Sequence, residues 1–191
     1  MKSKVIPISQ ARPRRDLEAR SDDELMELAA AEVKEAFAEL TRRYQARVRS
    51  FCRRWDAERG EDLAQEVFLQ LWRARGRYQP RGQFPLYLFT IVRNRCRNAR
   101  RSWFRSPSLE PLPPGLGDPA DQLDRMLEQE RARRVSQRVA QLPPKLREAV
   151  LLRFGEGMGY ADIAEIVHAP QATVRSRVFH GLRRLQKELC P

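Results

Sequence analysis

Apolar residues recur at three- and four-residue steps along most of the chain, which is the period of an amphipathic α-helix. The first stripe runs from Ala29 to Phe51 and predicts one helix or two in series; Ser21 and Glu24 form a capping box at its start. Further stripes cover residues 63–72 and, after Pro85, residues 88–103. Because no segment alternates steadily between apolar and polar positions, we predict an all-α fold.

The pattern after residue 123 predicts four more helices, over 124–141, 142–154, 160–167 and 171–189. The last two, with a turn at 168–170, have the length and pattern of a helix-turn-helix. His168 lies in that turn, where a left-handed backbone is often required. We expect these side chains to face inward: Ile163, Ala164 and Val167 on the first helix, and Val174, Val178, Leu182 and Leu185 on the second.

Five prolines and two glycines between residues 106 and 123 exclude a helix there and predict an extended, acidic linker. The chain of 191 residues has room for two small domains. We therefore expect a mobile basic tail (1–20), an N-terminal domain (21–105), the linker (106–123) and a C-terminal domain (124–191) that contains the helix-turn-helix.

The net charge of +12 is concentrated, because residues 67–105 hold ten arginines and no acid. A helix that is merely solvated usually mixes charges of both signs, so this segment predicts binding to nucleic acid. Arg93, Arg97 and Arg100 share one face beside the inner stripe, where guanidinium groups suit phosphates. Aromatic residues among the arginines, such as Tyr78 and Phe84, suit stacking on single-stranded bases.

The last helix predicts a second, different nucleic-acid surface. Opposite its inner stripe lies an outward arc suited to the edges of duplex DNA: Arg175, Ser176, Phe179, His180 and Arg183. An exposed Phe179 suits contact with a thymine methyl group. We interpret His180 as a hydrogen-bond donor to DNA, since no second metal ligand lies at a suitable spacing.

Several classes of protein are disfavoured. The three cysteines (Cys52, Cys96, Cys190) form no metal-ligand or disulfide pattern, and we expect Cys96 to lie in the core. No apolar run approaches the roughly 18 residues of a membrane span, and the N-terminus lacks the core of a signal peptide. We therefore expect a cytoplasmic protein with no membrane insertion, no catalytic residues, no metal and no cofactor.

Three segments resemble motifs of the extracytoplasmic-function (ECF) group of bacterial RNA polymerase sigma factors. Residues 61–75 (EDLAQEVFLQLWRAR) are similar to the polymerase-binding helix, and residues 84–101 (FPLYLFTIVRNRCRNARR) to the helix that melts and reads the promoter. Residues 142–185, from LPPKLREAV to VFHGLRRL, are similar to the second DNA-binding domain. The resemblance spans roughly residues 21–189.

The resemblance implies an alternative sigma factor that binds core RNA polymerase, at the β′ clamp helices and the β flap, and directs promoter-specific initiation. It implies three sites: polymerase binding by Asp62, Gln65, Glu66, Leu69 and Arg73; contact with the −10 box, duplex then melted, by Tyr78, Arg81, Asn94, Arg97, Asn98 and Arg101; and contact with the −35 box by Gln171, Thr173, Arg175, Ser176, Phe179, His180 and Arg183. An anti-sigma factor is a further implied partner. The sequence departs from the family pattern at Glu32–Val33, Tyr87, Asn98, His168 and Ala172.

Three other functions fit part of the sequence. A helix-turn-helix repressor that does not bind polymerase would explain residues 142–189 and leave 61–105 unexplained. A nuclease would need a metal ligand beside Asp62 and Glu66, and none is near in the sequence. A structural RNA-binding protein would not need the second reader of duplex DNA.

Overall fold

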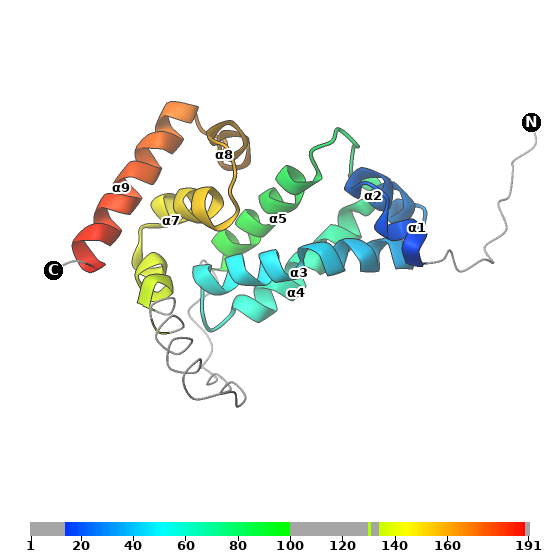
Figure 1. The fold of residues 1–191 in the computed structure, drawn as a ribbon, viewed down its shortest axis with the longest axis horizontal. Helices are drawn as coiled ribbons and strands as arrows, with labels where there is room; N and C mark the ends of the chain where they lie inside the picture. The colour runs from blue at the N-terminus through cyan, green and yellow to red at the C-terminus, as the bar shows by residue number, and fades with distance from the viewer. Residues whose placement is uncertain (1–13, 100–129, 131–133, 190–191) are drawn as a thin grey trace, which may run out of the picture.

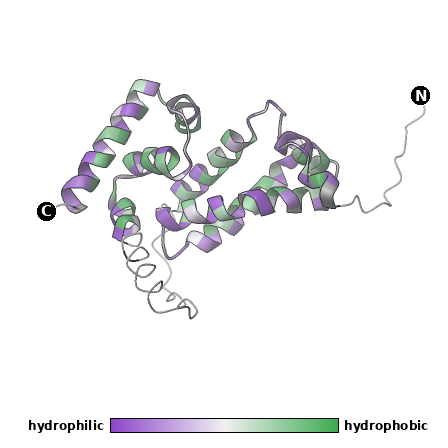
Figure 2. Cartoon of the chain, viewed as in Figure 1, coloured by the Kyte–Doolittle hydropathy of each residue, from purple (hydrophilic) through white to green (hydrophobic). Residues whose placement is uncertain are grey.

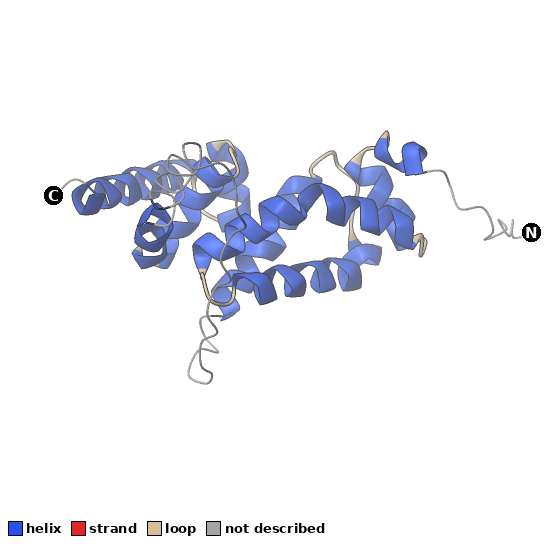
Figure 3. Ribbon diagram, turned by 60° about the horizontal axis from the view of Figure 1, so that its bottom comes forward, coloured by secondary structure: helices blue, strands red, loops and turns tan. Residues whose placement is uncertain are grey.

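The computed structural model describes residues 14–99, 130 and 134–189, and every regular element in them is helical (Figures 1 and 3). The prediction of an all-α fold is confirmed. The elements are α1 (Arg14–Glu18), α2 (Asp22–Ala30), α3 (Lys34–Trp55), α4 (Gly60–Ala74), a 3-10 turn (Arg75–Arg77), α5 (Phe84–Ala99), a helix over 134–141, α7 (Pro144–Val150), a π-helical turn (Leu151–Gly155), α8 (Tyr160–Val167) and α9 (Gln171–Leu189). The predicted linker, Arg100, Arg101 and Trp103 lie outside the described residues.

The first apolar stripe forms two helices, α2 and α3, divided at Glu32. Its φ of 64° is left-handed, the Glu32 N–H donates to the carbonyl of Ala29 (3.1 Å), and the Val33 N–H donates to that of Leu28 (3.0 Å). These two bonds form a Schellman motif, which ends a helix and turns the chain. The predicted capping box at Ser21 and Glu24 is present at the start of α2.

The N-terminal bundle is built around α3, which packs against α2, α4 and α5 (Figure 1). Hydrophobic and hydrophilic positions are mixed along each of these helices (Figure 2), and nearly all of the buried positions are apolar. Gly60 begins α4 where a Cβ atom would lie only 2.6 Å from the Cα of Arg53, so only glycine permits this approach of α4 to α3. Cys96 is buried as predicted, with its Sγ 3.9 Å from that of Cys52.

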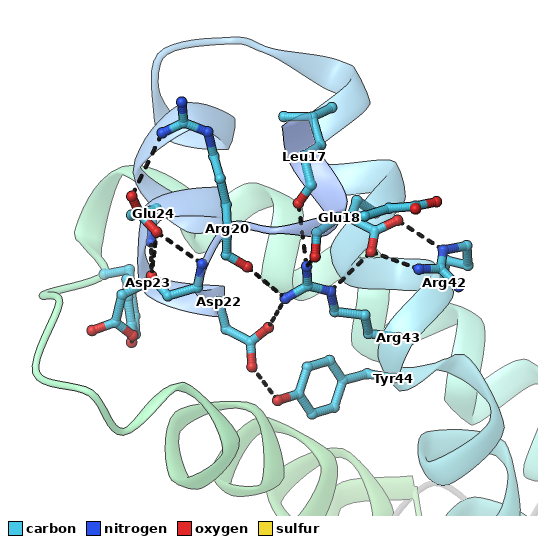
Figure 4. A network of polar contacts seen from close by, with 12 residues as sticks. Leu17, Glu18, Arg20, Asp22, Asp23, Glu24, Arg42, Arg43 and Tyr44 are labelled. Atoms are coloured by element: carbon cyan, nitrogen blue, oxygen red, sulfur yellow. Dashed lines mark hydrogen bonds and ion pairs between the residues drawn. The ribbon is translucent and has the colours of Figure 1, made fainter. Parts of the chain in front are cut away.

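A polar network fixes α1 and the start of α2 on α3 (Figure 4), so the prediction of a mobile tail was wrong for residues 14–20. The guanidinium of Arg43 forms ion pairs with Asp22 (2.8 Å) and Glu39 (2.9 Å). It also donates to three main-chain carbonyls of the preceding segment, those of Leu17, Glu18 and Arg20. Hydrogen bonds from Arg42 and Arg43 lower the pKa of the buried Glu39 carboxyl to about 2.

The C-terminal helices pack closely because α9 crosses α7 at a glycine. A Cβ atom at Gly181 would lie 2.6 Å from Cγ2 of Val150. Val174, Val178 and Leu185 are buried as predicted, but Leu182 is 41% exposed, so its assignment to the inner stripe was wrong. Gly181 occupies the buried position instead, and Leu182 is rotated by about 100° around the helix.

The turn between α8 and α9 confirms the left-handed conformation predicted at His168. Its φ is 50°, its N–H donates to the carbonyl of Glu165 (3.2 Å), and the Ala169 N–H donates to that of Ala164 (3.1 Å). This is a second Schellman motif with a non-glycine residue at the left-handed position. It sets the direction in which α9 leaves α8.

The C-terminal helices lie against the N-terminal bundle, chiefly α8 against α5 (Figure 1). Polar contacts join the two parts: Arg147 donates to the carbonyl of Trp55 (2.8 Å) with its guanidinium 5.0 Å from the Trp55 ring centroid, and Arg47 pairs with Glu156 (3.0 Å). Burial raises the pKa of the Glu156 carboxyl. In the described part of the chain, no helix has the length and apolar character needed to cross a membrane.

Candidate nucleic-acid and polymerase surfaces

The outer face of α4 is polar apart from one large apolar side chain. Its inner face is complete without it, since Leu63, Ala64, Val67 and Leu71 are all buried. The predicted polymerase-binding residues lie opposite: Asp62, Gln65, Leu69 and Arg73 are exposed, and Glu66 is half-buried with its carboxylate 3.6 Å from Arg95. Leu69 is 56% exposed at the centre of this set. These side chains are not needed for the core of the bundle and are available to a partner.

The segment before α5, residues 78–82, is a short loop with an aromatic base. The Tyr78 ring contacts those of Phe84 and Tyr87, with centroids 5.8 and 5.0 Å away. The Tyr78 hydroxyl donates to Oδ1 of Asp23 (2.5 Å), so its proton is not available to a base. Arg81 is exposed, as predicted for a residue that meets DNA.

One face of α5 presents amides and a guanidinium to solvent. Asn94, Arg97 and Asn98 are exposed along its second half, while Arg95 turns toward α4 and donates to Gln70 (2.6 Å). Asparagine amides can both donate to and accept from base edges. The structure thus brings together three of the residues predicted to contact the −10 box, whereas Arg101 lies outside the described residues.

Arg93 departs from the sequence interpretation, which placed it with Arg97 among phosphate-binding arginines. It is 7% exposed, and its Nε donates to Oε2 of Glu148 (3.1 Å), a carboxylate that is itself 1% exposed. Arg97 and Arg177 approach the same carboxylate at 3.6 and 3.7 Å. Arg93 is buried because α7 and α8 cover this side of α5, and it holds the two parts of the chain together instead of facing solvent.

On α9 the predicted outward arc is confirmed as a surface. Arg175, Ser176, Phe179, His180 and Arg183 are exposed, as is Gln171 in the first turn, while Thr173 is half-buried. Phe179 is 60% exposed, and its ring centroid lies 5.5 Å from that of His180. The Arg175 guanidinium lies 5.4 Å from the centroid of the Tyr160 ring on α8.

Two residues that matter for these surfaces were missed from the sequence. Glu148 was one acid in a moderately basic segment, and Asp23 was one of several acids in a first helical turn. Arg93 is 55 residues from Glu148, and Tyr78 is 55 residues from Asp23, so no local spacing could indicate these contacts. Among the described residues, no group of three or more His, Cys, Asp or Glu side chains is placed to hold a metal ion.

Two sequence families match the chain in order. Sigma-70 region 2 matches residues 40–104, which hold α4, the 78–82 loop and α5. Sigma-70 region 4 matches residues 132–185, which hold the helix-turn-helix. The RNA polymerase sigma-H factor of Pseudomonas aeruginosa is 33% identical over 187 residues, covering 92% of this chain and 97% of its own length. The chain belongs to the sigma-70 family.

Further relatives place this sigma factor in the ECF group. The ECF RNA polymerase sigma-E factor of Haemophilus influenzae is 30% identical over 188 residues, covering 91% of this chain and 98% of its own length. The protein is therefore an alternative sigma factor that directs transcription initiation, as the sequence resemblance implied. A repressor limited to residues 142–189 is excluded, because region 2 accounts for the segment that it left unexplained.

Solved structures confirm the fold of the sigma factor. CnrH in complex with the cytosolic domain of CnrY gives a TM-score of 0.65 at 23% identity, covering 88% of this chain and 96% of that one. RpoE of Bartonella quintana in complex with the anti-sigma factor NepR gives a TM-score of 0.61 at 23% identity, covering 80% and 96%.

Proposed function

We propose that this sigma factor uses three separate surfaces in initiation: α4 binds core polymerase, the 78–82 loop and α5 open and read the −10 box, and α9 reads the −35 box. The observation that carries the proposal is that each helix has a complete buried face and a separate exposed polar face. The exposed side chains are therefore available for binding. They differ in kind on the helix proposed for polymerase, on that for the −10 box and on that for the −35 box.

At the −10 box, we assign base contacts to Asn94 and Asn98 and phosphate contacts to Arg97. Extruding a base from the stack costs a few kcal/mol, which stacking and hydrogen bonds must offset. The asparagine amides supply those hydrogen bonds from α5, and the aromatic base of the 78–82 loop packs on Phe84 and Tyr87 in the first turn of the same helix.

At the −35 box, the outward arc of α9 enters the major groove of duplex DNA. The first turn of α9 points its main-chain N–H groups toward the phosphates, which favours anion contacts there. Arg175 and His180 supply donors for base edges, and Phe179 supplies an apolar surface for a thymine methyl group.

We assign core RNA polymerase (the β′ clamp helices and the β flap), promoter DNA and an anti-sigma factor as partners, in the cytoplasm. The anti-sigma assignment is supported by RpoE of Bartonella quintana, which was solved with the anti-sigma factor NepR. No residue of this chain is assigned a catalytic role. We retain residues 21–105 and 124–191 as the two functional domains.

The polymerase surface is tested by exchanging Asp62 and Glu66 for alanine together. We expect this pair of substitutions to abolish binding to core polymerase in a pull-down, with the helical circular dichroism unchanged. Glu27→Ala with Glu35→Ala is the matched control, because it removes two exposed carboxylates from α2 and α3. Equal binding by the Asp62/Glu66 variant and the control would remove α4 from the proposal.

The DNA surfaces are tested on promoters selected from a randomised library. Asn94→Ala or Asn98→Ala should reduce open-complex formation, measured by permanganate reactivity, more than it reduces closed-complex binding.

Arg175→Ala should weaken binding to the selected −35 duplex about tenfold, with little effect on scrambled DNA. His180→Arg should change the preferred base at one −35 position, and identical preferences would show that His180 does not read the box.

A further inference from the structure

A single carboxylate on α2 holds both ends of the 78–82 loop. Oδ1 of Asp23 accepts a hydrogen bond from the Tyr78 hydroxyl (2.5 Å), and Oδ2 accepts one from the main-chain N–H of Gly82 (2.6 Å). Three residues lie between these anchors, and all three are exposed: Gln79, Pro80 and Arg81. The loop is therefore closed at its base while its tip faces solvent.

The Asp23 carboxylate is itself held in place. It lies in the first turn of α2, directly after Asp22, whose side chain is bonded to Arg43 and Tyr44 on α3 (Figure 4). The capping box of Ser21 fixes the same turn from the other side. None of these groups is among the side chains assigned to DNA, so their common effect is to set where Asp23 points.

The two anchors also define the conformation of the loop. Gly82 has a φ of 68°, which glycine adopts at no steric cost, and its N–H is turned back toward α2. The Tyr78 ring packs on Phe84 and Tyr87. Burial, and to a lesser degree the hydrogen bond to Asp23, raises the pKa of the Tyr78 hydroxyl. The hydroxyl accordingly stays protonated and remains a donor.

We infer that Asp23 is a positioning residue for −10 recognition: it presets the 78–82 loop in the conformation that receives an extruded base of the melted strand. The inference rests on the proposed function of the loop and α5. Asp23 itself makes no contact with DNA, because both of its carboxylate oxygens are bonded to the loop. If the loop adopts the binding conformation for only a fraction of the time, its affinity for the base falls in proportion to that fraction.

The direction in which DNA affinity changes after Asp23→Ala distinguishes a positioning role from a purely electrostatic one. Removing a carboxylate beside a DNA-binding surface lessens repulsion of phosphates, so an electrostatic role predicts tighter binding after Asp23→Ala. Positioning predicts weaker binding, by about tenfold or more, because the loop loses both hydrogen bonds that hold it to Asp23. Asp23→Asn keeps one acceptor oxygen and should give an intermediate loss.

The experiment uses holoenzyme assembled from the full chain and core polymerase. The probe is a fluorescein-labelled single strand carrying the −10 sequence that the parent selects from a randomised library, prepared intact and with an abasic site at each position in turn. Binding is measured by anisotropy for the parent, Asp23→Ala, Asp23→Asn and Tyr78→Phe. Glu27→Ala, which removes an exposed carboxylate from the same helix, is the matched control.

We expect Asp23→Ala to lower the affinity for the intact strand about tenfold. On the one abasic strand that lacks the extruded base, its affinity should equal that of the parent. A merely structural role of Asp23 would not produce this coupling between Asp23 and one base. Asp23→Ala and Tyr78→Phe should be non-additive on the intact strand. Core binding and binding to the −35 duplex should not change.

Three results would overturn the inference: unchanged or tighter binding by Asp23→Ala, the same loss on every abasic strand, or loss of core binding by both Asp23 variants. If the parent holoenzyme binds the selected strand no better than a scrambled one, the proposed −10 function fails as well. Because that outcome is read from the parent alone, the two failures are distinguishable.

Discussion

The carboxylate of Glu148 is 1% exposed and lies within 4 Å of three guanidinium groups, those of Arg93, Arg97 and Arg177. Glu148→Gln keeps the shape of the side chain and removes its charge. Arg93, which is 7% exposed, is then left buried without a carboxylate partner. Breaking a buried ion pair from one side costs about 3–5 kcal/mol, so we expect a loss of this size in the free energy of unfolding.

The assay is urea denaturation followed by circular dichroism at 222 nm. Glu61→Gln is the matched control, because Glu61 also pairs with two arginines, Arg49 and Arg53, but its side chain is 42% exposed. Exposed pairs contribute about 0–1 kcal/mol, so the control should lose little. The double variant Glu148→Leu with Arg93→Met should recover much of the loss, since it removes both buried charges together.

The expected loss requires the C-terminal helices to be packed against α5 in the free protein. If Glu148→Gln loses no more stability than Glu61→Gln, the pair is not formed in solution and the packing described at α5 is refuted. If the double variant is less stable than Glu148→Gln, the loss comes from packing at this position and not from the unpaired arginine.

Three further predictions concern stability. The folded pKa of Glu39, about 2 against 4.5 when unfolded, corresponds to about 3 kcal/mol that is present above pH 4.5 and lost as the pH falls toward 2; the stability difference between the parent and Glu39→Gln should therefore shrink between pH 5 and pH 3 in urea titrations, and a constant difference would contradict this. His168→Gly should raise the free energy of unfolding by about 0.5–1 kcal/mol, because glycine adopts the left-handed φ of 50° without a Cβ contact, whereas His168→Ala should give no gain. Gly181→Ala should lower stability by about 1–3 kcal/mol despite better helix propensity, because its Cβ would meet Val150 at 2.6 Å; Gly76→Ala, with no neighbour within 4 Å, is the control and should be close to neutral.

The helices and the helix-turn-helix could be predicted from the sequence because they depend on local patterns. The period of the apolar residues gave the fold class, the Ser21 capping box marked the start of α2, and His168 in a short turn indicated a left-handed residue. The outward arc of α9 could be predicted from its inner stripe, because the residues that face inward on a helix determine which residues face outward.

The remaining features depend on contacts between distant parts of the chain. Leu182 was misplaced because apolar character alone was read as burial, whereas the crossing of α7 over α9 admits only the hydrogen of Gly181. Arg93 was assigned to the phosphate face because helical periodicity shows which residues share a face but not what covers that face. In the same way, the roles of Glu148 and Asp23 depend on partners that are distant in the sequence, such as Arg93 and Tyr78.

The arginines of the basic segment differ in how much salt dependence they can lend to DNA binding. Binding releases counterions that had condensed on the DNA, and the slope of log K against log salt counts the phosphates that the protein neutralises. Arg75, Arg93, Arg95 and Arg97 each lie within an ion-pair distance of a carboxylate inside the protein. A guanidinium that is already neutralised by its own chain displaces fewer cations from DNA than a solvated one. We therefore expect the salt slope for this sigma factor to be shallower than the ten arginines of residues 67–105 suggest.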